Sequence, residues 1–360
     1  MAEANVPESV VSGYWGKCHC QGIAVDRANR AIYYSFTTKL IKTDFSGNLI
    51  GSVDGLIGHL GCIDFCEADG KVYGSLEFKN DQIGRGILKA LGKDAAVEDA
   101  FYCAIFDGDA VTRPDMDAEK DGVMRAVYLP DVTEAYKAEA HADGRAYAHR
   151  YGCSGVDGTG WGRAPGEEKD VLLIAAGIYG DITRGDNDFQ LLFRYDHALS
   201  WWDTIARPLD QTAMHRSGAR AQHTLFLYTG NTTWGVQNLE YDAFTGDWYL
   251  AVYPGEKPRF PNYSMFVLDG ARRAEPAVHP ATGEPIERVF LKRAGAGENG
   301  VWGNRFPFGS TGMYAFGDGR WYFRRTETIR CGGTIPSCGC TAPPAGKTLP
   351  LFRRNKPKTL

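Results

Sequence analysis

Two histidines stand at the same distance before two similar strand-like segments. His19 lies four residues before Ile23, and His59 lies four residues before Ile63. In three further segments of this type the equivalent residue is glycine: Gly152, Gly235 and Gly309. If the five segments surround one channel, both imidazoles project into space that the glycines leave open. Because imidazole titrates near neutral pH, we predict that His19 and His59 form an acid/base pair.

Other polar and aromatic residues occur close to these histidines in the same alignment. Gln21 and Gln237 occupy a shared polar column two residues further on, and Trp234 precedes the glycine of its segment. We expect these three residues to hold a small polar ligand, since sugars stack on aromatic faces and pair with amides. Arg150 and Tyr151 precede the third segment and are expected to assist the histidines.

Two kinds of glycosidic cleavage fit these residues. In β-elimination from a uronic acid, arginine neutralises the carboxylate, while His and Tyr transfer protons at C5 and at the leaving oxygen. In hydrolysis, two carboxyl groups flank the scissile bond. Glu77 and Glu240 are the candidate substrate-binding acids, and Asp64 and Asp157 also lie in the aligned segments. The choice between lyase and hydrolase stays open at this point.

The segments that would position these residues are short, aromatic and β-branched, and they are separated by Gly, Asp and Asn. This pattern is typical of strands and tight turns. A loose repeat begins near residues 21, 61, 154, 237 and 311, and each copy has two to four strand-like runs. Four strands per repeat is the pattern of a propeller blade. We predict an all-β propeller, with five blades as the first choice and seven or eight if the long gaps contain more.

The predicted domain covers residues 1–330, followed by a tail at 331–360 rich in Cys, Pro and basic residues. We expect this tail to be disordered or loosely docked. The fifth copy lacks obvious third and fourth strands, and residues 12–15 are the candidate for closing it. The fourth strand of the fourth copy is expected at 288–291.

The turn rhythm at residues 68–73 and 316–322, with Asp-Gly between two strands, resembles that of NHL-type and SMP-30-like (gluconolactonase-like) propellers. The residue types are also weakly similar to those of propeller-fold polysaccharide lyases, such as the ulvan lyases, and of five-bladed glycosidases. The resemblance implies a carbohydrate-active enzyme that acts at the channel mouth. A non-catalytic propeller that binds a ligand or a protein, and a metal-dependent lactonase-like hydrolase, are the alternatives.

Charge and composition limit the classes of partner that we expect. The formal net charge is −4 and no basic cluster is large enough for a duplex, so we expect no nucleic acid as partner. We also expect no membrane span and no resident cofactor, with a divalent metal as the alternative. The acidic loop at 180–188 departs from EF-hand spacing and predicts an ordinary turn. A reducing cytoplasm is expected, or secretion if a signal peptide is missing; the oligomeric state is left open.

Overall fold

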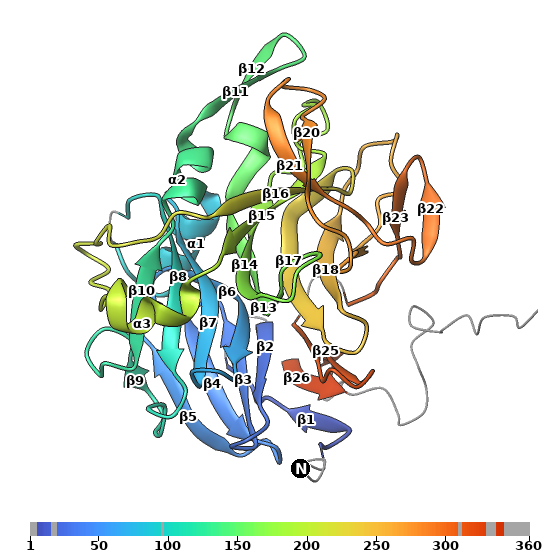
Figure 1. The fold of residues 1–360 in the computed structure, drawn as a ribbon. Helices are drawn as coiled ribbons and strands as arrows, with labels where there is room; N and C mark the ends of the chain where they lie inside the picture. The colour runs from blue at the N-terminus through green and yellow to red at the C-terminus, as the bar shows by residue number, and fades with distance from the viewer. Residues whose placement is uncertain (1–5, 16–19, 95–96, 309–311, 329–335, 342–360) are drawn as a thin grey trace, which may run out of the picture.

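The computed structural model of the protein describes residues 6–15, 20–94, 97–308, 312–328 and 336–341. In these ranges five sheets stand around a central channel, which confirms the predicted β-propeller and gives five blades (Figure 1). The innermost strand of each blade contacts the innermost strands of both neighbouring blades. The ring of blades is therefore closed.

The first three blades each contain four antiparallel strands and follow the predicted order. The first blade consists of β2 (Cys20–Asp26), β3 (Ala31–Phe36), β4 (Lys39–Asp44) and β5 (Leu49–Asp54), with the short β9 (Met116–Asp117) on its edge. The second consists of β6 (His59–Cys66), β7 (Lys71–Phe78), β8 (Ala100–Asp107) and β10 (Met124–Tyr128). The third consists of β13 (Cys153–Arg163), β14 (Asp170–Ile178), β15 (Phe189–Tyr195) and β16 (His223–Tyr228), extended by β21 (Pro285–Val289) and β20 (Glu275–Val278).

The fourth blade differs from the prediction at its outer edge. It contains three strands, β17 (Thr232–Asp242), β18 (Asp247–Pro254) and β19 (Met265–Leu268). The segment expected to be its fourth strand is divided. Strand β21 pairs in parallel with β16 of the third blade, whereas Leu291 forms an isolated bridge with Leu268 of β19. Covering the edge of β16 with β21 removes a row of unpaired backbone groups.

The fifth blade joins the two ends of the described chain. Its strands are β24 (Met313–Ala315), β25 (Trp321–Thr328), β26 (Pro336–Thr341) and β1 (Ser9–Val11). Strand β1 pairs with β26, so the closing N-terminal strand lies at 9–11 and not at the expected 12–15. Residues 336–341, which fall in the predicted tail, form β26 between β25 and β1.

The remaining elements lie in the loops between the blade strands. The helices are α1 (Gln82–Ala90), α2 (Pro130–Lys137) and α3 (Trp201–Thr204), with 3₁₀ turns η1 (Arg150–Gly152) and η2 (Ala198–Ser200). The described residues also form two small hairpins, β11 (Glu139–Ala142) with β12 (Arg145–Ala148), and β22 (Ala296–Glu298) with β23 (Val301–Gly303). In the described ranges no helix has the length and apolar character needed to cross a membrane.

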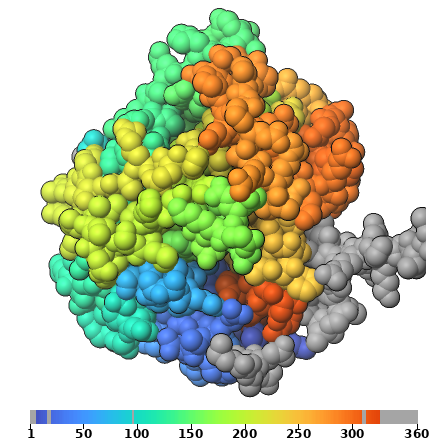
Figure 2. All heavy atoms as spheres, in the orientation of Figure 1, coloured from blue at the N-terminus to red at the C-terminus, as the bar shows by residue number. Residues whose placement is uncertain are grey.

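The hydrophobic core is divided into five clusters, one at each boundary between neighbouring blades. The cluster that closes the ring packs Ile23 and Tyr34 of the first blade against Tyr322 of the fifth. In the space-filling view, the blue and red-orange atoms of these two blades meet side by side (Figure 2). Each blade therefore buries its two faces against its neighbours, and no blade has a core of its own.

Glycines let the inner strands approach closely. A Cβ atom on Gly22 of β2 would lie 2.5 Å from the backbone nitrogen of Ile63 on β6. Inside the channel, Cys62 Sγ lies 3.3 Å from the carbonyl oxygen of Thr159 and 3.7 Å from Asn238 Oδ1. These buried side chains fill the middle of the channel, so its two mouths form separate recesses.

Closure of the ring through β1 yields a stability prediction. Val10 is buried in the cluster between the fifth and first blades, whereas its neighbour Val11 is 60% exposed. We expect Val10→Asp to lower the free energy of unfolding by about 2 kcal/mol or more, because a carboxylate would be buried without a partner. Val11→Asp, on the same strand, should change it by less than about 0.5 kcal/mol. Urea unfolding of both variants measures this, and equal losses would contradict the assigned closure.

Candidate functional site

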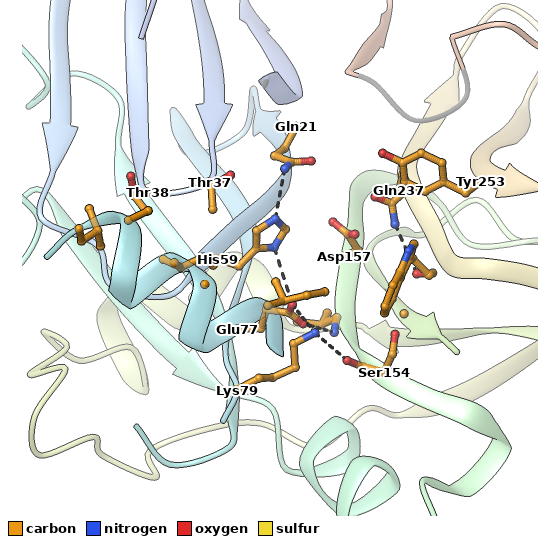
Figure 3. A pocket seen from close by; sticks show the side chains of 18 of the residues that line it. Gln21, Thr37, Thr38, His59, Glu77, Lys79, Ser154, Asp157, Gln237 and Tyr253 are labelled. Carbon is orange, nitrogen blue, oxygen red and sulfur yellow. Dashed lines mark hydrogen bonds and ion pairs between the residues drawn. The ribbon is translucent and has the colours of Figure 1, made fainter. Parts of the chain in front are cut away.

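A recess lies at the channel mouth where the innermost strands β2 and β6 begin (Figure 3). Its volume is about 620 Å³, which is in the range of small-molecule sites. Strands from four blades and helix α1 contribute to its walls. The polar side chains at its floor include Gln21, His59, Glu77, Lys79, Asp157 and Gln237.

A buried ion pair forms the floor of this recess. Glu77 and Lys79 lie two residues apart around the end of β7, so their side chains reach the same face, and Lys79 Nζ lies 2.7 Å from Glu77 Oε1. Lys79 Nζ also donates to the carbonyl oxygen of Ser154, while Glu77 Oε2 accepts from the backbone N–H of Val156. The pair therefore fastens the second blade to the third.

Each charge of this pair offsets the effect of burial on the pKa of the other. Burial acts to lower the pKa of Lys79, but the Glu77 carboxylate outweighs it and raises that pKa above its ordinary value. Burial raises the pKa of Glu77, and the adjacent Lys79 ammonium opposes this rise. The Lys79 ammonium therefore favours the ionised form of Glu77 against the effect of burial, and removing either partner would leave an unpaired buried charge.

His59 is a neutral hydrogen-bonding group in this structure. Burial, together with the Lys79 charge, lowers the pKa of His59 to about 4. Gln21 Nε2 donates to His59 Nε2 across 3.2 Å, which leaves the ring proton on Nδ1, 3.7 Å from Glu77 Oε1. At neutral pH the ring therefore carries one proton and no net charge.

Asp157 faces the same recess in a contrasting environment. Its Oδ1 atom is buried and has no hydrogen-bond partner among the described residues. Burial and the nearby Glu77 carboxylate raise the pKa of Asp157 well above its ordinary value. The recess thus contains one carboxyl group paired with a cation, Glu77, and a second, Asp157, whose pKa is raised further.

Aromatic side chains stand at the rim of the recess. Trp15, Trp234 and Tyr253 line it, and Trp234 is 38% exposed. Trp234 and Gly235 both have positive φ, 64° and 75°, where the pairing of β17 with β18 shifts register. A tryptophan rarely adopts this strained conformation, and such strain concentrates at functional sites.

The structure places the candidate residues as follows. Gln21, His59, Glu77, Trp234 and Gln237 line this one recess. His19 falls outside the described residues, so the histidine pair stays a prediction.

Arg150 and Tyr151 do not line the recess. Both side chains bind the Glu284 carboxylate, and Tyr151 packs edge-on against Phe226. The reason is local: His149, Tyr151 and Gly152 all have positive φ, so the chain turns sharply before β13 begins at Cys153. The strand alignment assumed extended backbone through these positions, and it is wrong there.

Glu240 faces the opposite mouth of the channel. It lies three residues beyond Gln237 on β17, and it lines a second recess of about 340 Å³ together with Asp64 and Tyr314. Burial raises the pKa of Asp64 to about 7, and burial with the Asp64 charge raises the pKa of Glu240 well above its ordinary value. Both carboxyls accept backbone hydrogen bonds, Asp64 from Trp161 and Glu240 from Ala315.

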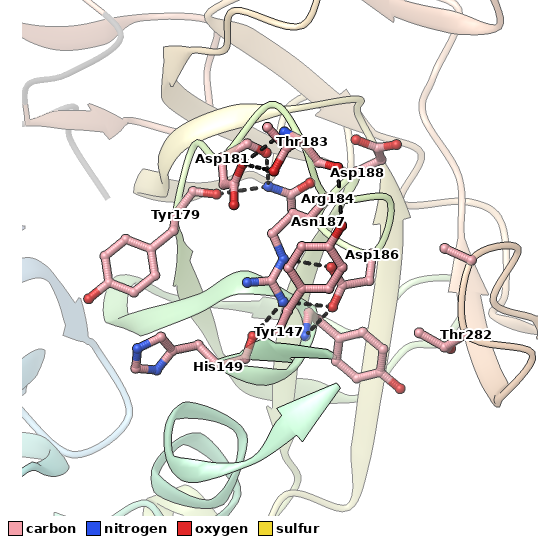
Figure 4. A network of polar contacts seen from close by, with 12 residues as sticks. Tyr147, His149, Tyr179, Asp181, Thr183, Arg184, Asp186, Asn187, Asp188 and Thr282 are labelled. Carbon is pink, nitrogen blue, oxygen red and sulfur yellow. Dashed lines mark hydrogen bonds and ion pairs between the residues drawn. The ribbon is translucent and has the colours of Figure 1, made fainter. Parts of the chain in front are cut away.

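The acidic loop at 180–188 is an internally bonded turn (Figure 4). Arg184 forms a buried bidentate pair with Asp186 and donates to two backbone carbonyls, those of Ala148 and His149. Lys257 Nζ lies 2.5 Å from Asp188 Oδ1 and 2.6 Å from Asn187 Oδ1. Within the described part of the chain, no three His, Cys, Asp or Glu side chains are grouped to hold a metal ion.

Lys79 and Tyr253 were not identified from the sequence. Lys79 follows β7 and Tyr253 lies in β18; neither strand is innermost, and the alignment considered only the innermost ones. The alternation Glu77-Phe78-Lys79 contained a signal, because residues two apart at a strand end share a face.

Comparisons with known proteins add little to this geometry. No protein-family model matches the chain, and no curated protein matches it. Among solved structures, the β-propeller domain of Cps50 (Swd1) from Myceliophteria thermophila is 10% identical, with 89% of this chain and 82% of that chain covered and a TM-score of 0.32. The PQQ domain of pyranose dehydrogenase from Coprinopsis cinerea is 9% identical, with 89% of this chain and 81% of that chain covered and a TM-score of 0.34. A calcium structure of a Trichoderma reesei family AA12 carbohydrate-active enzyme is 10% identical, with 89% and 80% covered and a TM-score of 0.34. Likeness this distant carries no argument about function.

The low pKa of His59 predicts acid sensitivity. Between pH 6.5 and about 4 the unfolded chain binds a proton at this residue and the folded protein does not. The free energy of unfolding should therefore fall as the pH falls through this window, by about 3 kcal/mol in total. Urea unfolding at several pH values should show this loss in the wild type and in the control His141→Gln, an exposed histidine. It should be absent from His59→Gln, and identical pH profiles for His59→Gln and wild type would refute the assignment.

Proposed function

We propose that the recess at the first mouth of the channel hydrolyses a glycosidic linkage of a small saccharide. The observation that carries the proposal is a pair of carboxyl groups, Glu77 and Asp157, that line one recess and of which only Glu77 is ion-paired with Lys79 among the described residues. Burial raises the pKa of both groups, but the Lys79 ammonium opposes the rise at Glu77, so the pKa of Asp157 is raised further. Two carboxyls with different pKa values are the arrangement that glycoside hydrolysis uses.

Asp157 is the proposed general acid. A carboxyl group that keeps its proton near neutral pH can donate it to the leaving oxygen of the glycoside. Burial and the Glu77 carboxylate raise the pKa of Asp157 well above its ordinary value, which favours the protonated form, and the residue lines the recess.

Glu77 is the proposed base or nucleophile. This role needs an ionised carboxylate, and the contact with Lys79 at 2.7 Å favours that form. Lys79 then acts as a positioning residue: it fixes the charge and the orientation of Glu77 through its bond to the Ser154 carbonyl and does not contact the substrate itself.

The remaining polar and aromatic residues of the recess suit a sugar. Gln21, Gln237 and His59 offer amide and imidazole groups that exchange hydrogen bonds with hydroxyls, and Trp234 offers an exposed ring face. In this proposal the neutral His59 binds substrate and does not act as the acid or base. Hydrolysis is preferred to elimination because Arg150 and Tyr151, the residues that would handle a uronate, are paired with Glu284.

The proposal predicts a large loss of activity in two variants. Asp157→Asn and Glu77→Gln should each lower kcat by at least about 10²-fold, because each removes a proton-transfer or nucleophilic group. Activity should also fall as the pH rises far enough to deprotonate Asp157, since the acid form is the active one. The measurement is release of reducing ends from a panel of plant, algal and host-glycan oligosaccharides.

Glu240→Gln is the matched control, because it replaces a buried carboxyl at the opposite mouth; it should retain activity within about threefold. Circular dichroism of each variant checks that the fold is intact. If an unsaturated uronate forms, which ultraviolet absorbance detects, the reaction is elimination and the proposal of hydrolysis is wrong. Saturable binding of an oligosaccharide without any cleavage would instead favour the non-catalytic binding propeller.

A further inference from the structure

One wall of the recess is apolar and belongs to a single helix. Helix α1 lines the recess with Ile83, Gly86, Ile87, Ala90 and Leu91. These positions recur at intervals of three and four residues, so they share one face of the helix. Ile83 and Leu91 are 37% and 39% exposed, which is high for large aliphatic side chains. In Figure 3 the helix stands on the side of the recess opposite Gln237 and Tyr253.

Attachment of α1 to the protein does not account for this face. The helix is anchored by Leu88, its one fully buried side chain, which joins the cluster between the first two blades. At its start, Asp81 accepts a hydrogen bond from the backbone N–H of Gly84 and lies 3.7 Å from Lys79 Nζ. The helix is thus anchored through Leu88 and through its N-cap. Its apolar face is not needed for this attachment and lines the recess.

Gly86 gives an independent indication that this space is kept for a ligand. Glycine inside a helix lowers stability relative to alanine. At Gly84 the residue is required, because a Cβ atom there would lie 1.7 Å from the Lys79 carbonyl oxygen. At Gly86 nothing lies within 4 Å of the Cβ position, and the backbone is not in the left-handed region. Folding therefore does not demand glycine at this position, and its missing side chain leaves a notch in the recess wall.

We propose that α1 forms a subsite for an apolar group of the ligand, adjoining the polar floor. The substrate class is then a glycoside with an apolar aglycone. The sugar part of this assignment rests on the proposed function, and the apolar part rests on α1. The apolar face and the polar floor line one recess, so one amphiphilic molecule contacts both. Burial of its apolar part against Ile83, Ile87 and Leu91 supplies affinity in proportion to the area removed from water.

The test uses N-phenyl-1-naphthylamine, a neutral apolar dye whose fluorescence rises on burial. The folded wild type should bind it saturably. Gly86→Leu, which fills the notch, and Ile83→Ser, which removes apolar area, should each weaken binding at least fivefold. Val278→Ser, which removes an aliphatic side chain 66% exposed on β20, should bind like wild type.

Gly86→Ala distinguishes an effect on the space for the ligand from an effect on folding. It should raise the thermal midpoint, because alanine favours the helix, and should still weaken dye binding. Dye binding that is absent in the wild type, or equal in Gly86→Leu and wild type, would overturn the inference. Asp157→Asn should bind the dye normally. If the protein binds the dye at α1 but cleaves no glycoside, the proposed hydrolysis is contradicted and the apolar subsite is supported.

Discussion

The ion pair between Glu77 and Lys79 is the interaction on which the candidate site depends. Both side chains are more than nine-tenths buried, so neither charge is tolerated without the other. Through Ser154 and Val156 the pair joins the second blade to the third, and through Asp81 it reaches the cap of α1. One electrostatic requirement therefore fixes the floor of the recess, a blade boundary and the helix that forms the apolar wall.

The five-blade architecture could be predicted because its signal is periodic. Each repeat contributes an innermost strand with small residues, such as Gly22 on β2, and the close approach of β2 to β6 explains why those residues are small. The polar column containing Gln21 and Gln237 was visible for the same reason. The closing strand was misplaced because Ser9–Val11 is too short to carry a pattern, and its pairing with β26 depends on a contact between the two ends of the chain.

The errors in the site have equally definite causes. Arg150 and Tyr151 were assigned to the channel by extending a strand backwards through residues that adopt positive φ, which sequence pattern alone does not reveal. Glu240 was assigned to the same mouth as Gln237, although three residues of strand carry it about 10 Å along the channel. Lys79 was missed because the alignment considered only the innermost strands, whereas Lys79 follows β7 and matters through its buried ion pair with Glu77.

The two mouths of the channel show why buried carboxyls alone do not make a candidate site. At the far mouth burial raises the pKa of both Asp64 and Glu240, the Asp64 charge raises that of Glu240 further, and no described ion pair includes either of them. Both carboxyls accept hydrogen bonds from backbone N–H groups. At the near mouth the buried Lys79 ammonium opposes the rise that burial causes in the pKa of Glu77, whereas the pKa of Asp157 is raised well above its ordinary value. Acid/base chemistry needs this difference between neighbouring groups, and the placement of Lys79 supplies it at one mouth.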